Sequence, residues 1–161
     1  MRFPFHNLND QEFEKLVGQI CMEVLGTGTV VFTTGRDGGR DGKFNGTANK
    51  FPSKKSSTTG KFIVQAKHTE NPYASCSESK FDTIINKEIP RIEKLVSTKD
   101  LEYYLLFTNR RLTGDTDKNI TNKIKTVDGV KNAWLIAKDN LEGYLIKHKE
   151  IWWTGPKNVD S

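Results

Sequence analysis

Two short segments of this chain carry the side chains that are best suited to chemistry. The first is the glycine-rich turn Gly35–Gly42, which holds Asp41 near its end. The second, Phe62–His68, begins as an apolar strand and contains Gln65 and Lys67 toward its end. Alternation along a strand puts Gln65 and Lys67 on one face. A carboxylate, a neutral oxygen ligand and an ammonium group that converge on one point suit a hard divalent cation beside a phosphate.

The chemistry that such a site predicts is the hydrolysis of a phosphodiester. This reaction needs a deprotonated water in line with the leaving oxygen, and positive charge against the phosphate oxygens. Mg²⁺ supplies both effects, and it is held by one or two carboxylates while it keeps several waters. Asp41 and Gln65 are suitable ligands, and Lys67 adds a compact positive charge. The residues therefore predict a metal-dependent nuclease.

The glycine-rich turn has other interpretations. It lacks the spacing of a dinucleotide-binding fingerprint. As a calcium loop that starts at Asp37, it fails at its third position, Gly39, and at its twelfth, Ala48. A tight hairpin turn with solvated charges remains the alternative to a site. The role of Asp37 stays open between a second acid and a turn-forming residue.

Basic residues surround both segments. The chain has 161 residues, a net charge of +5 and 28% charged residues, a balance that permits binding to a polyanion. The expected nucleic-acid contacts are Lys43, Lys50, Lys54, Lys55, Lys61 and His68. Solvated loop lysines are the alternative for any one of them.

The sequence also bears on compartment. It contains two cysteines without the spacing of a disulfide framework or a zinc site. Its N-terminus lacks the apolar core of a signal peptide, and no run of residues reaches membrane-spanning length. We therefore expect a cytoplasmic protein without a membrane segment.

The order of predicted elements indicates an α/β protein with a central mixed sheet flanked by helices. Hydrophobic periodicity predicts helices over 10–25, 78–97, 117–125 and 139–148. Strands are predicted over 29–33, 43–47, 61–67, 103–108 and 132–137. Residues 49–60 are rich in Ser, Thr and Lys and are predicted to form a flexible hairpin loop. Pro90 is expected to kink the second helix or to break it in two.

Three features together resemble the Mrr-like branch of the PD-(D/E)XK restriction-endonuclease-like superfamily. They are the helix sequence Phe13-Glu14-Lys15-Leu16, the Gly-Arg-Asp-Gly turn and the strand that ends in Gln65-Ala66-Lys67. That branch carries glutamine where other branches have a second acid. The resemblance covers residues 10–110, including the later strand 104–109. It implies a restriction-endonuclease-like core and an endonuclease that cleaves double-stranded DNA with Mg²⁺ or Mn²⁺.

The resemblance also implies roles for single residues. Asp41 matches the metal-binding aspartate, and Gln65 matches the second metal ligand. Lys67 matches the lysine that positions or activates the attacking water. Glu14 matches a glutamate of the first helix that completes the acidic cluster in many members. This chain departs from the family in its lysine-rich segment 43–61, which is longer than a minimal hairpin.

Mrr-like domains occur in type IV restriction enzymes and as N-terminal effectors of bacterial antiviral systems, including STAND-type NTPases. We therefore expect a nuclease domain over residues 1–150 and an extension over 151–161. The extension would lead to a C-terminal NTPase or sensor domain, with homo-oligomer formation on activation. One rival is a non-catalytic nucleic-acid-binding module with the same fold. A second is an interaction domain, indicated by Trp134, Trp152 and Trp153, although a core or domain-junction role is favoured for them.

Overall fold

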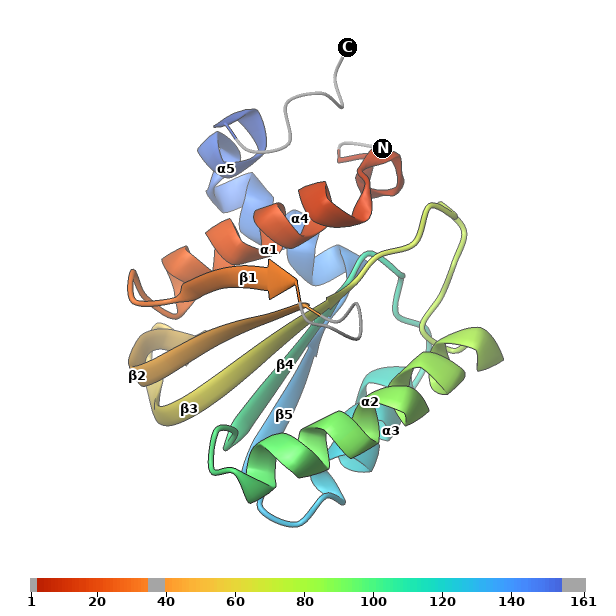
Figure 1. The fold of residues 1–161 in the computed structure, drawn as a ribbon. Coiled ribbons are helices and arrows are strands. Elements are labelled where there is room, and N and C mark those ends of the chain that lie inside the picture. The colour runs from red at the N-terminus through yellow and green to blue at the C-terminus, as the bar shows by residue number, and fades with distance from the viewer. Residues whose placement is uncertain (1–2, 35–39, 155–161) are drawn as a thin grey trace.

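A five-stranded mixed sheet forms the centre of the molecule. The computed structural model describes residues 3–34 and 40–154. The strands lie in the order β1-β2-β3-β4-β5 (Figure 1). Their bounds are β1 Val30–Thr34, β2 Arg40–Ser53, β3 Ser56–Lys67, β4 Tyr103–Thr108 and β5 Asn132–Ile136. The pairs β1–β2 and β2–β3 are antiparallel, whereas β3–β4 and β4–β5 are parallel. The predicted α/β fold with a mixed sheet is confirmed.

Helices cover both faces of this sheet. One face carries α1 Asp10–Val24, α4 Lys138–Lys147 and α5 Lys149–Thr154, and the other carries α2 Ser79–Ser97 and α3 Thr116–Lys125 (Figure 1). A short 3-10 turn over Phe5–Asn7 precedes α1. Among the described helices, none combines the length and the apolar composition that crossing a bilayer requires.

Helix α1 forms because its sequence carries both a start signal and an apolar stripe. Asn9 caps the helix: its side chain accepts the Glu12 N–H at 2.7 Å, and the Glu12 carboxylate accepts the Asn9 N–H at 2.9 Å. Phe13, Leu16 and Ile20 then recur at helical spacing and are buried. This stripe packs against one face of β3 in a single apolar cluster.

Strand β3 separates the two halves of the core. Phe62 and Val64 belong to the cluster with α1. Ile63, between them, belongs to a second cluster with Phe81 and Ile85 of α2. Alternation along the strand therefore assigns odd-numbered residues here to the α2 face and even-numbered residues to the α1 face.

The hairpin predicted over 49–60 is present, but the predicted length of its loop is wrong. The structure has a long hairpin in which β2 continues to Ser53 and β3 begins at Ser56. The Thr47 and Thr59 hydroxyl oxygens lie 2.8 Å apart across the strands. Phe51 is buried, and its ring packs edge-on against Trp134 at 4.8 Å between ring centroids. Strand pairing and this aromatic contact outweigh the loop-like composition.

Of the two alternatives predicted for Pro90, the break is wrong, because α2 is one continuous helix that contains Pro90. Pro90 itself is exposed, whereas Phe81, Ile85 and Ile92 are buried on both sides of it. Pro90 has no backbone N–H and so cannot donate a hydrogen bond within the helix. Packing of the buried stripe on both sides of Pro90 stabilises the helix instead.

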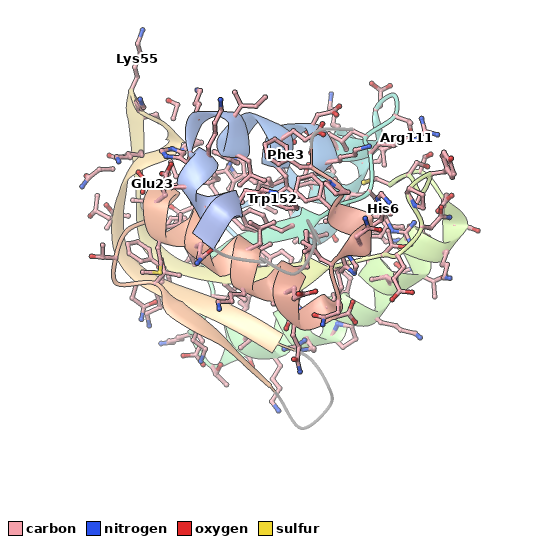
Figure 2. All side chains as sticks on the ribbon, turned by 90° about the horizontal axis from the view of Figure 1, so that it is seen from above. Phe3, His6, Glu23, Lys55, Arg111 and Trp152 are labelled. Atoms are coloured by element: carbon pink, nitrogen blue, oxygen red, sulfur yellow. The ribbon has the colours of Figure 1, made fainter. Side chains whose placement is uncertain are left out.

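The last described helix packs on the same core. Ile151 of α5 is buried. The Trp152 ring lies edge-on to Phe3 at 5.4 Å and to Phe5 at 5.9 Å between centroids (Figure 2). Helix α5 thus packs against the N-terminal segment, and Trp152, like Trp134, is partly buried and packs against the core.

Candidate active site

Asp41 and Gln65 are direct partners in the pairing of β2 with β3. Directly opposite residues of an antiparallel pair lie on one face of the sheet. The register of the two strands thus brings Asp41 and Gln65 together, whereas the sequence related these two positions only through a motif. The first part of the glycine-rich turn, residues 35–39 with Asp37, lies outside the described residues.

Gln65 and Lys67 lie on the α2 face at the carboxyl end of β3. Gln65 is 3% exposed. The Lys67 side chain is 25% exposed, so it lies at the boundary between the apolar core and solvent. The hairpin therefore presents an amide and a cation side by side, next to the Asp41 position.

Glu88 of α2 is a further residue of this site that sequence analysis missed. Its Oε2 accepts from Lys67 Nζ at 2.9 Å, and its Oε1 accepts from Arg91 Nη1 at 3.5 Å. It is the one buried carboxylic acid among the residues whose burial is described. A signal was present in the sequence, since Glu88 falls between Ile85 and Ile92 on the buried stripe of the helix.

Glu14 lies on α1, which packs on the opposite face of β3 from Gln65 and Lys67. Glu14 is half-buried and follows Phe13, whose ring centroid lies 5.2 Å from that of His68. The beginning of α1 is therefore near the carboxyl end of β3. A contact of Glu14 with the other site residues stays a prediction.

His68 points to the α1 face and is not brought together with Lys67. Its side chain is 2% exposed. Nε2 lies 2.8 Å from the Phe5 carbonyl oxygen, and Nδ1 lies 3.1 Å from Asp10 Oδ1. These contacts join the end of β3 to the N-terminal segment and to the first turn of α1.

The hairpin lysines do not gather on a single surface. Lys43 is exposed and lies two residues beyond Asp41 on β2. Lys50 lies nine residues beyond Asp41, which corresponds to about 30 Å along an extended strand. Lys50 and Lys54 line a pocket of about 570 Å³ between the hairpin, the end of α1 and the end of α4. Lys55 projects from the tip of the hairpin (Figure 2). Lys61 Nζ donates to the Lys99 carbonyl oxygen at 2.7 Å.

The segment that follows Lys67 is hydrogen-bonded to residues just after β4. The Asn109 side chain accepts from the Thr69 N–H at 2.9 Å and donates to the Thr69 carbonyl at 2.8 Å. Arg110 is buried, donates to Glu78 at 2.7 Å and to the Ser75 carbonyl at 3.1 Å, and lies over the Phe81 ring. These contacts connect the segment after β3 to the end of β4.

The two cysteines do not contribute reactive thiolates. Cys21 and Cys76 are both buried. Burial raises the pKa of the Cys21 thiol far above its ordinary value and that of Cys76 to about 12. Both thiols are therefore protonated near neutral pH, which makes them poor nucleophiles and poor metal ligands.

The ligand types at the site suit a hard cation. Asp41, Gln65 and Glu88 offer carboxylate and amide oxygens, which Mg²⁺ and Mn²⁺ prefer over sulfur and imidazole ligands. Within the described part of the chain, no three His, Cys, Asp or Glu side chains gather at metal-binding distance. The Asp41 side chain lies outside that part.

Comparison with known proteins identifies the family. The Mrr_cat family model, described as a restriction endonuclease, matches residues 5–136. This match extends from the turn before α1 to the end of β5 and includes Asp41, Gln65, Lys67 and Glu88. No curated protein and no solved structure matched the chain. The match covers most of the chain and agrees with the fold, so the protein belongs to the Mrr_cat restriction endonuclease family.

Proposed function

We propose that this chain is a metal-dependent endodeoxyribonuclease and that it acts as the effector of a bacterial antiviral or restriction system. Membership of the restriction endonuclease family supports a nuclease domain. The observation that carries the proposal is the pairing of Asp41 with Gln65, with Lys67 two residues along the same strand face. Metal-dependent hydrolysis of a phosphodiester needs oxygen ligands for the cation and a positive charge beside the phosphate, and these three side chains can supply them.

In this proposal Asp41 and Gln65 hold Mg²⁺ or Mn²⁺, and Glu14 completes the ligand set from α1. When bound, the cation lowers the pKa of a water and neutralises charge on the phosphate. Lys67 contributes a donor and a positive charge that can bind a phosphate oxygen or orient the attacking water. Its 25% exposure lets the ammonium reach an incoming substrate.

The substrate in this proposal is double-stranded DNA. The core cluster under α2 and α3 includes residues of β3, β4 and β5, and neither helix reaches over β2 (Figure 1). Lys43 is exposed on β2 and pairs in register with Ile63, which assigns it to the α2 face, the same face as Gln65. We infer that Lys43 contacts a phosphate near the scissile bond.

Lys50, Lys54, Lys55 and Lys61 are proposed as weaker phosphate contacts. Lys50 already forms an ion pair with Glu23 at 3.5 Å. A duplex that touched both Lys43 and Lys54 would have to run along the whole hairpin. These lysines would then add affinity without base recognition, because phosphate contacts carry no sequence information directly.

The rival function is a DNA-binding module without turnover. The ion pair of Lys67 with Glu88 favours this rival, because a lysine held by a carboxylate is not free to act on a phosphate. Incubation of supercoiled plasmid with the protein, with Mg²⁺ or with a chelator, separates the two. We expect nicked and linear products with Mg²⁺ and none with the chelator. DNA binding without any metal-dependent product would establish the rival.

A further inference from the structure

The hairpin part of the proposed site supplies only one carboxylate. Gln65 is neutral, so Asp41 alone contributes negative charge from β2 and β3. Sites for Mg²⁺ beside a phosphate are generally built with one or two carboxylates. A second carboxylate close to Lys67 would strengthen the attraction for a divalent cation, because Coulomb interactions are stronger away from bulk water.

Glu88 lies at this point of the structure. Its side chain is 10% exposed and it occupies a position on the buried stripe of α2, where Ile85 and Ile92 flank it. A buried carboxylate costs free energy unless charged or hydrogen-bonded partners compensate it. An apolar side chain would fill this position without that cost, so stability of the helix alone does not account for a glutamate here.

The partners of Glu88 also indicate a role in the site. Each of its oxygens accepts from one cation, Lys67 at 2.9 Å and Arg91 at 3.5 Å. Both cationic side chains are about one-quarter exposed, at 25% and 26%. Lys67 can thus leave Glu88 toward solvent while Arg91 continues to balance part of its charge.

We propose that Glu88 is a further carboxylate of the cation site, in addition to Asp41 and Glu14. This inference rests on the proposed nuclease function. Without a divalent cation, Glu88 holds the Lys67 ammonium group. With the cation bound, the Glu88 carboxylate turns to the cation, and Lys67 is released to the phosphate. Lys67 and the cation therefore compete for the same carboxylate.

Calorimetric titration of the protein with Mn²⁺, without DNA, tests this proposal directly. Glu88→Gln should lower the Mn²⁺ affinity by about tenfold or more, the order of effect that supporting residues have at metal sites. Glu93→Gln is the matched control, because Glu93 is an exposed glutamate on the same helix. Its Mn²⁺ affinity should equal that of the wild type.

Lys67→Ala supplies the second, opposite prediction. Removal of the competing ammonium group should raise the Mn²⁺ affinity, and the increase should disappear in the Lys67→Ala, Glu88→Gln double variant. Circular dichroism confirms folding of each variant. If Glu88→Gln does not fold, Glu88→Asp replaces it in the single and the double variant, and its shorter carboxylate should likewise lower the Mn²⁺ affinity and abolish the increase.

An unchanged affinity in folded Glu88→Gln, or no increase in Lys67→Ala, would overturn the role of Glu88. Failure of this inference is distinguishable from failure of the proposed function. A wild-type protein that cleaves DNA with Mn²⁺, beside a Glu88→Gln variant of normal Mn²⁺ affinity, removes only the inference. A wild-type protein that neither binds Mn²⁺ nor cleaves DNA removes both.

Discussion

Asp41 and Gln65 stand directly opposite each other in the antiparallel pairing of β2 with β3. This pairing connects the end of the glycine-rich turn to the strand that carries Lys67, although the two segments are separated by the whole hairpin. Backbone hydrogen bonds of the ladder fix the register, so the spacing of the two residues does not depend on any side chain. The proposed site is thus positioned by two paired strands and not by a loop.

Replacement of Gln65 should distinguish a ligand from a packing residue. Gln65→Glu should retain cleavage activity, because a carboxylate oxygen can replace the amide oxygen as a cation ligand. Gln65→Ala should reduce the rate, but less than loss of the Asp41 carboxylate does, since a neutral ligand contributes less charge. Single-turnover cleavage rates measure both variants. An inactive, folded Gln65→Glu beside an active Gln65→Ala would contradict the assignment.

Substitution of Lys43 should affect DNA binding, whereas substitution of His68 should affect stability. Lys43→Ala should weaken DNA binding and reduce the salt dependence of the affinity by about one counterion, because it removes a phosphate contact. It should leave the free energy of unfolding nearly unchanged, since Lys43 is exposed. Fluorescence anisotropy with a labelled duplex, over a range of salt concentrations, measures the slope.

His68→Ala should lower the free energy of unfolding by about 1–3 kcal/mol, because it removes the contacts of a buried imidazole with the Phe5 carbonyl and the Asp10 carboxylate. DNA affinity should change little, since the side chain is 2% exposed. Urea unfolding measures the stability. A stable variant with weakened DNA binding would return His68 to the DNA-contacting set that its sequence position predicts.

Clustering of the domain should increase double-strand cleavage. One site of this kind cuts one strand, so two copies must act across a duplex, and two-fold symmetry is the commonest arrangement. A fusion of residues 1–161 to an inducible dimeriser should linearise plasmid faster after induction, because the effective concentration of the second domain rises. Equal linearisation rates with and without the inducer, over a wide protein concentration range, would leave a constitutive nuclease instead.

The elements that position the site were predictable where local pattern and tertiary packing agree. The apolar stripe of α1 recurs at helical spacing, and the short apolar run before Gln65 is rich in strand-forming residues. Both elements form, although β3 begins at Ser56, earlier than predicted. The sequence predicted Gln65 and Lys67 on one face because alternation in a strand is independent of the rest of the fold.

The long hairpin was not predictable by the same means. Residues 49–60 have the Ser, Thr and Lys content of a loop, and their pairing depends on contacts such as Phe51 with Trp134, which are distant in sequence. Burial of His68 depends in the same way on the N-terminal segment. Glu88 is the intermediate case, since its place on the helical stripe was visible but its partner Lys67 was not.

Metal-dependent cleavage of supercoiled plasmid by the Asp41→Ala and Lys67→Ala variants tests the central claim most directly. Both proteins should remain folded and bind DNA, while their cleavage rates with Mg²⁺ fall by at least about 100-fold, as expected for loss of a catalytic group. Lys149→Ala, an exposed lysine of α5 on the opposite side of the sheet, is the control and should cleave as fast as the wild type. Wild-type rates in a folded Asp41→Ala or Lys67→Ala protein would contradict the assignment of this site.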